Sequence, residues 1–134
     1  MKNIILFFAF SIALVSSAFA EWTGGFSEGM YSNVVIKNIT TGQIDTHPYF
    51  CIEASNGARA CSIKNLSIWG PSYGTLYDMA LYFYMTGESV RVYYDPGVWY
   101  DESFSTEITA NALVGLSTCG MDKCFGPNRQ IPSK

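Results

Sequence analysis

The 134-residue sequence has little charge and only one histidine, and both shortages argue against certain functions. It has 8 Lys or Arg against 11 Asp or Glu, a formal net charge of −3. Because such a surface repels phosphate backbones, the composition predicts no nucleic-acid partner. His47, which precedes Pro48, lacks the further ligands of a metal site and the placed partners of a catalytic triad. We therefore expect neither a metal nor a cofactor.

Catalytic motifs are also missing. The segment Gly115-Leu-Ser-Thr-Cys119 lacks the second glycine of a nucleophile elbow. A glycosidase needs two placed carboxylates, and the available acidic residues are Asp95, Asp101, Glu102 and Glu107. They lie beside turn residues, where charged side chains are usually solvated. The sequence thus predicts no catalytic residue.

Long apolar runs are limited to the N-terminus. Ile4–Val15 is apolar except for one serine, and it is shorter than the roughly 20 residues that span a bilayer. Ala18-Phe19-Ala20 then has the form of a signal-peptidase site. We expect residues 1–20 to be a cleaved signal peptide, with export through the periplasm and no transmembrane segment. An uncleaved anchor is the alternative. Residues 21–134 then form one domain.

The four cysteines indicate disulfides in an exported chain. Cys51 and Cys61 enclose nine residues that include the hairpin signal Asn56-Gly57, whereas Cys119 and Cys124 enclose four. Three pairings are open, and sequential pairing is favoured because it closes two short loops. A four-thiolate zinc site is the competing interpretation. The nine-residue gap and an oxidising compartment both argue against it.

Most of the remaining pattern predicts strands. Val90, Val92 and Tyr94 alternate with Arg91 and Tyr93, as on the two faces of one strand. Similar runs predict strands over Asn33–Ile44, Tyr49–Glu53, Ala60–Trp69, Ser89–Asp95 and Asn111–Thr118. No linker or repeat divides them, so a single, mainly β domain is expected.

One helix interrupts the strands, beginning after Ser72 and ending at Thr86 before Gly87. One apolar stripe at helical spacing consists of Leu76, Met79, Ala80 and Phe83. A second, expected on the opposite side, consists of Tyr73, Tyr77, Leu81 and Tyr84. A surface helix of a monomer needs one wet face, so the second stripe predicts contact with another subunit. A helix buried within one chain is the alternative. Three strands, a helix and further strands is the order of an OB-fold barrel.

Several short segments together resemble the B subunits of the AB5 toxin family that includes subtilase cytotoxin and typhoid toxin. They are Glu21-Trp-Thr-Gly24, Gly42-Gln-Ile-Asp45, Pro48-Tyr-Phe-Cys-Ile52, Ser67-Ile-Trp69, Tyr82-Phe-Tyr84, Val90-Arg91, Asn111-Ala-Leu-Val-Gly-Leu-Ser117 and Cys124-Phe-Gly-Pro127. The resemblance implies a five-stranded OB-fold barrel with one central helix, assembled as a homopentameric ring. It also implies recognition of sialic-acid-terminated host glycans and a toxin A subunit whose tail enters the central pore. A secreted lectin or adhesin without an A subunit is the alternative.

The resemblance also implies a glycan site. In this family a serine hydroxyl at the position of Ser32 binds the sialic acid carboxylate, and a tyrosine at the position of Tyr94 reaches the extra hydroxyl of N-glycolyl sialic acid. Arg91 matches a basic residue near the site. The expected glycan-binding residues are therefore Glu28, Met30, Tyr31, Ser32, Arg91 and Tyr94.

Overall fold

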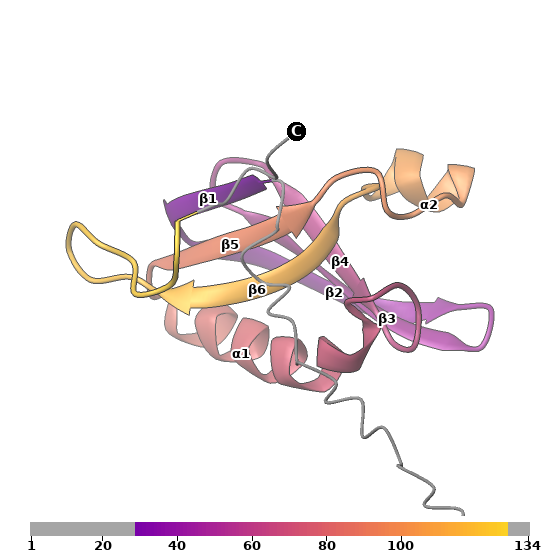
Figure 1. The fold of residues 1–134 in the computed structure, drawn as a ribbon, viewed down its shortest axis with the longest axis horizontal. Helices are drawn as coiled ribbons and strands as arrows, with labels where there is room; N and C mark the ends of the chain where they lie inside the picture. Colours follow the sequence, from indigo (N-terminus) through magenta and orange to yellow (C-terminus); the bar gives the residue numbers. More distant parts are fainter. Residues whose placement is uncertain (1–28, 129–134) are drawn as a thin grey trace, which may run out of the picture.

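The structure, a computed structural model, describes residues 29–128. Its elements are β1 (Gly29–Val34), β2 (Ile36–Ile44), β3 (His47–Ala54), β4 (Arg59–Ile63), η2 (Gly70–Ser72), α1 (Tyr73–Thr86), β5 (Val90–Asp95), α2 (Glu102–Glu107) and β6 (Ala112–Thr118) (Figure 1). The signal peptide expected over residues 1–20 and the site residue Glu28 lie outside the described residues. In the part that is described, no helix is long and apolar enough to cross a membrane.

The strands form one sheet that curls back on itself. Its order is β1-β5-β6-β4-β3-β2, in which β4 and β6 run parallel and the other neighbours antiparallel. Only Val35 separates β1 from β2, yet they lie at opposite edges of the sheet. The sheet must therefore bend until its edges meet. Counted as one bent strand, β1 and β2 give the five strands of the OB-fold barrel.

Two predicted strand boundaries were wrong. The first strand begins at Gly29 rather than Asn33, so most of β1 was not predicted. The strand expected over Ala60–Trp69 ends at Ile63. Asn65 and Ser67 have positive φ angles of 62° and 61°, which extended backbone does not allow.

The short helix α2 was not predicted. It begins at Glu102 because the Asp101 carboxylate accepts a hydrogen bond from Phe104 N at 2.9 Å.

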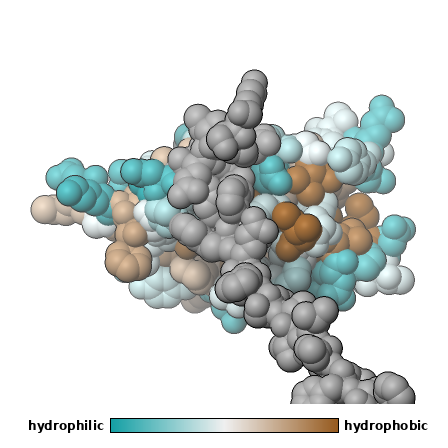
Figure 2. Space-filling view, viewed as in Figure 1, coloured by the Kyte–Doolittle hydropathy of each residue, from teal (hydrophilic) through white to brown (hydrophobic). Residues whose placement is uncertain are grey.

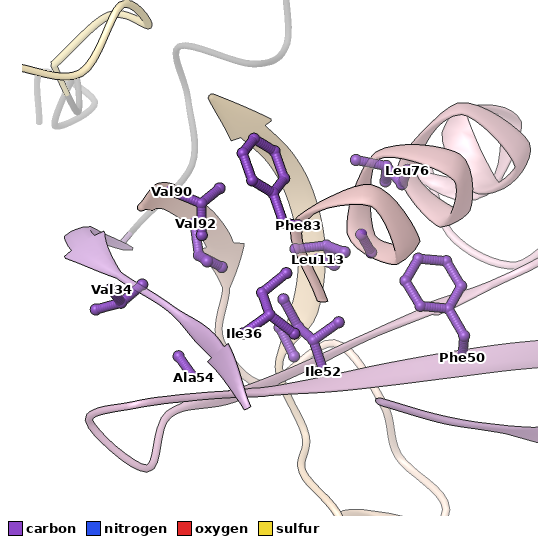
Figure 3. Packing of buried hydrophobic residues seen from close by; sticks show 12 residues of the cluster. Val34, Ile36, Phe50, Ile52, Ala54, Leu76, Phe83, Val90, Val92 and Leu113 are labelled. Atoms are coloured by element: carbon purple, nitrogen blue, oxygen red, sulfur yellow. The ribbon is translucent and has the colours of Figure 1, made fainter. Parts of the chain in front are cut away.

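The main core lies between the inner face of the sheet and α1. Figure 1 shows α1 packed along one side of the curled sheet, and in Figure 3 Leu76 and Phe83 of this helix point toward the strand residues. Phe83, Val90 and Leu113 are fully buried there. The opposite face of the sheet carries a second buried cluster, which includes Cys51, Cys61, Trp69, Tyr93, Trp99 and Phe104.

The helix α1 has the predicted ends but not all of the predicted faces. Gly87 closes it in the left-handed conformation (φ 66°), as expected, whereas the Ser72 side chain makes no capping hydrogen bond. The stripe containing Leu76, Ala80 and Phe83 is buried, as predicted.

The placement of Tyr73 and Tyr77 opposite that stripe was wrong. Both rings pack edge-on against Phe50, with centroids 5.4 and 5.3 Å away. Each lies three residues before a buried position, Leu76 or Ala80, and residues three apart are neighbours on a helix. Of the predicted second stripe, Leu81 is half-buried and Tyr84 is exposed, near the exposed Tyr82 and Met85.

Both predicted disulfides are confirmed. Cys51 of β3 stands directly opposite Cys61 of β4, so their bond links two strands in register. The predicted hairpin is present, but only Gly57 of the Asn-Gly pair has a positive φ, of 84°. Its connection is therefore a three-residue loop, residues 55–57, rather than a two-residue Asn-Gly turn. Cys119 and Cys124 close the loop that follows β6, seen as the yellow loop in Figure 1.

Candidate glycan-binding site

The candidate site lies on the ribbon formed by β1 and β5, which contains a β-bulge. Tyr31 pairs with Val92 and Val34 pairs with Val90. Ser32 and Asn33 therefore both stand opposite the single residue between the two valines of β5. Asn33 has φ 55°, a left-handed conformation that asparagine tolerates better than most residues. Because a bulge re-aims side chains, this irregularity helps to leave Ser32 exposed at the edge of the sheet.

Arg91 is the residue that faces the bulge, and it binds the Ser32 hydroxyl. Its Nε donates to Ser32 Oγ at 2.8 Å. A serine hydroxyl has one donor and two acceptor positions. With the guanidinium occupying an acceptor position, the Ser32 O–H remains able to donate to an external acceptor.

The positive charge of Arg91 is buried, since the residue is only 8% exposed. Its Nη1 donates to the carbonyl oxygens of Gly126 and Pro127 at 2.9 and 3.0 Å. No carboxylate within residues 29–128 forms an ion pair with it. Neutral oxygens therefore solvate this cation without neutralising it, which favours an anion at the neighbouring surface.

Two further side chains hold the segment Gly126–Pro127, which we call the C-terminal strap. Tyr93 Oη donates to Pro127 O at 2.5 Å, and Gly126 N donates to Ser117 Oγ at 2.6 Å. A Cβ at Gly126 would overlap both Tyr93 Oη and Ser117 Oγ. Position 126 of the strap therefore has room only for glycine.

The expected site residues are divided between the two faces of the ribbon. Tyr31 and Tyr94 stack with ring centroids 5.0 Å apart and planes 7° from parallel, and both pack against the main core. Met30 packs against the second cluster on the opposite face, the face that alternation also gives to Arg91. The structure therefore pairs Ser32 with Arg91 and Tyr31 with Tyr94, but it does not gather all five described residues into one pocket.

Three residues that bind or form the strap were not predicted from the sequence as site residues: Tyr93, Ser117 and Gly126. A signal for Tyr93 was present, because Arg91 and Tyr93 share the polar face of an otherwise apolar strand. The C-terminal segment itself has no periodicity that points to a partner.

A second arginine, Arg59, forms an ion pair with a neighbouring carboxylate. Arg59 Nε donates to Glu53 Oε2 at 2.6 Å, and Asn38 donates to the other carboxylate oxygen at 2.8 Å. The hydrogen bond from Arg59, followed by that from Asn38, lowers the pKa of the Glu53 carboxyl below its ordinary value of 4.5. Arg59 also borders a shallow recess beside Tyr31 and Tyr94.

Another hollow, of about 610 Å³, lies away from the β1–β5 ribbon. The loops 66–69 and 95–100 line it, with Ile68 and Tyr100 exposed. Figure 2 shows hydrophobic residues on this face between α2 and the β2–β3 hairpin.

No protein-family model matches the chain. It is 55% identical over 121 residues to the B subunit of subtilase cytotoxin from Escherichia coli, covering 87% of this chain and 86% of that protein. The chain belongs to the family of subtilase cytotoxin B subunits. The family predicted from the short segments is therefore confirmed.

Solved structures of related toxin subunits have the same fold. One, described as the A-subunit of the AB5 toxin from E. coli with Neu5Gc-2,3Gal-1,3GlcNAc, has 57% identity and a TM-score of 0.76, covering 83% of this chain and 99% of that one. A mutant PltB homopentamer of Salmonella typhi has 46% identity and a TM-score of 0.75, with 81% and 99% covered. These likenesses confirm the OB-fold expected for a toxin protomer of this family.

Proposed function

We propose that this protein is the receptor-binding part of an AB5-type toxin, which binds sialic-acid-terminated host glycans as a homopentamer and carries a catalytic A subunit. Support comes from 55% identity to a toxin B subunit and from similar structures, one with a sialylated trisaccharide and one a homopentamer. The observation that carries the proposal is the hydrogen bond from Arg91 to the exposed Ser32 hydroxyl.

The chemistry of this pair suits a carboxylate. The Ser32 O–H donates to the carboxylate of sialic acid, while Arg91 behind it supplies positive charge that no acidic side chain of residues 29–128 neutralises. A hydrogen bond to a charged group contributes about 1.5–3 kcal/mol. Neither hollow described above is lined by Ser32 or Arg91, and Ser32 is exposed, so each site should bind weakly.

Weak sites become effective in a ring. A millimolar affinity corresponds to about 4 kcal/mol, and several identical sites that bind one cell surface raise avidity by about 10²–10⁴. Loss of one hydrogen bond per site therefore removes a large share of the binding energy and is repeated in every protomer.

The decisive experiment compares Ser32→Ala with Ser72→Ala, an exposed serine whose side chain makes no capping bond. Ser32→Ala should keep the pentamer in native mass spectrometry but lose nearly all binding to sialylated cells, and sialidase treatment of the cells should have the same effect on the native protein. Ser72→Ala should bind normally. Wild-type binding by Ser32→Ala pentamers would refute the assignment of the site.

For the ring and pore, the candidate contacts are residues of the predicted second stripe of α1 that, within residues 29–128, make no ring contact with the core of the single protomer: Leu81, which is half-buried, and Tyr84, which is exposed. Leu81 and Tyr84 remain candidates for contact with a neighbouring protomer or with the A subunit, whereas Tyr73 and Tyr77 already contact Phe50. Leu81→Asp should weaken the pentamer or its co-elution with the A subunit. If both survive unchanged, this face of α1 does not contact another subunit.

The proposal includes secretion after removal of residues 1–20 and no catalytic activity of its own. The two disulfides suit an oxidising compartment. Mass spectrometry of the secreted protein tests the expected mature N-terminus at Glu21.

A further inference from the structure

Arg91 has two sets of partners that lie on different parts of the chain. Nε binds Ser32 of the bulge, and Nη1 binds the two carbonyl oxygens of the C-terminal strap. A guanidinium is planar and rigid. A displacement of the strap therefore rotates or shifts the same group that orients the Ser32 hydroxyl.

The strap is built into the protein rather than resting on its surface. Tyr93, Ser117 and Arg91 are each at least nine-tenths buried, and their polar atoms meet at Gly126–Pro127. Arg91 and Ser117 are also direct cross-strand partners on β5 and β6. The chain reaches this seat by turning back after β6 through the loop closed by Cys119 and Cys124, and in Figure 1 it then runs back toward β1.

Burying an arginine is costly unless its donors are satisfied. Among residues 29–128, Arg91 is the only buried charged residue. A neutral donor such as a glutamine amide could satisfy the two strap carbonyls without the cost of burying a charge. The retained charge, directed at an exposed hydroxyl, indicates a role in binding an anion.

We infer that the C-terminal strap and Arg91 together form a positioning device for the glycan site: the strap holds the guanidinium, and the guanidinium orients the Ser32 hydroxyl toward the ligand carboxylate. Arg91 is thus a positioning residue rather than a sugar contact, and the strap controls affinity without touching the sugar. This inference rests on the proposed function.

The test displaces the strap and leaves Ser32 and Arg91 in place. Gly126→Ala introduces a Cβ that overlaps Tyr93 Oη and Ser117 Oγ. Sialyllactose and its carboxamide analogue, in which the acid is replaced by a neutral amide, are titrated by NMR against the assembled protein. Gly126→Ala should weaken binding of the acid by roughly ten- to hundredfold, the loss expected for one hydrogen bond to a charged group. It should weaken binding of the amide by a clearly smaller factor, because the amide carbonyl accepts only a neutral hydrogen bond.

Two comparisons complete the test. Met121→Ser, in the disulfide-closed loop that precedes the strap and 99% exposed, should bind both ligands as the native protein does. If Gly126→Ala fails to assemble, Ser117→Ala replaces it, because it removes the hydroxyl that accepts from Gly126 N, whereas the Tyr93 hydroxyl also accepts from Arg91 Nη1 at 3.5 Å.

The outcomes distinguish failure of the positioning device from failure of the proposed glycan site. Native affinity for the acid in Gly126→Ala, together with lost affinity in Ser32→Ala, overturns the positioning device and leaves the proposed site intact. An equal loss for acid and amide also overturns it, because a general structural defect affects both ligands alike. Native binding by Ser32→Ala refutes both the site and the device.

Discussion

The two arginines of the sheet, Arg59 and Arg91, are held in opposite ways. The Arg59 side chain is 46% exposed and forms an ion pair with a carboxylate, whereas Arg91 is 8% exposed and binds only neutral oxygen atoms within the described chain. Each also lies near a disulfide: Arg59 on the strand pair joined by Cys51–Cys61, and Arg91 against the strap that follows Cys119–Cys124.

This difference separates a surface ion pair from a charge available for function. Exposed ion pairs contribute little to stability because water and salt screen them. The electric field of a buried cation that has no acidic partner is screened less, since little water surrounds it. Burial and partner type therefore support Arg91, rather than Arg59, as a residue of the proposed site, a distinction that the residue type alone does not make.

The largest effect is expected from Arg91→Met, which keeps most of the stem but removes the donors. Binding of sialylated glycans should be lost, because the Ser32 hydroxyl loses its partner. The free energy of unfolding should fall by about 1–3 kcal/mol, as the two strap carbonyls lose theirs. Glycan titration and chemical denaturation measure the two effects. Unchanged binding would show that the charge of Arg91 has no role in the site.

Removal of each disulfide comes next and should sharpen the contrast. Loops of these lengths stabilise by about 2–3 kcal/mol each in the chain-entropy account. Cys51→Ala/Cys61→Ala should lower the unfolding temperature but spare glycan binding by the folded protein. Cys119→Ala/Cys124→Ala should in addition weaken glycan binding, because the strap loses its anchor. Equal binding by the two variants would contradict this division.

A smaller effect is expected at the inner face of the ribbon. Tyr94→Phe should lower the preference for N-glycolyl over N-acetyl sialic acid by roughly two- to tenfold, the value of one neutral hydrogen bond. Glycan-array titration with matched pairs measures the ratio. Tyr100→Phe, at a 90% exposed position away from the ribbon, is the control. A ratio that does not change would remove Tyr94 from the proposed site.

The smallest effect is expected for Arg59→Met. The pKa of Glu53 is lowered chiefly by the hydrogen bond from Arg59, so in the variant it should rise toward 4.5. Since the folded-state pKa is depressed, the stabilising contribution is present above pH 4.5 and is lost as the pH falls through the folded-state value. NMR titration of the Glu53 carboxyl measures the shift, and thermal unfolding near neutral pH should hardly change. A large loss of stability there would mean that Arg59 has a structural role beyond this pair.

Local signals were sufficient for much of the fold. Gly87 ends the helix and Gly57 closes the hairpin loop because each glycine adopts a positive φ angle that other residues avoid. The break at Val35 has no comparable local signal, since it depends on β1 pairing with β5 while β2 pairs with β3. Tyr73 and Tyr77 were assigned to the wrong face because an amphipathic ring suits a core margin as well as an interface.

Only part of the candidate site was open to sequence reasoning. The resemblance pointed to Ser32 and Arg91 as expected site residues, and a hydrogen bond joins them in the structure. It did not reveal that Tyr31 and Tyr94 lie on the opposite face, because the bulge that displaces Ser32 is defined by pairing with β5. The strap was missed for the same reason, as its partners lie on strands remote in sequence.

The bent strand around Val35 also has a kinetic consequence. The β2–β3–β4 hairpins join neighbouring parts of the chain, whereas Gly29 of β1 must find Tyr94 of β5. Because long-range pairings form slowly, β1 should dock after the hairpins and the Cys51–Cys61 bond have formed. Ser32 lies on this late strand, so the proposed glycan site should be completed only in the final step of folding.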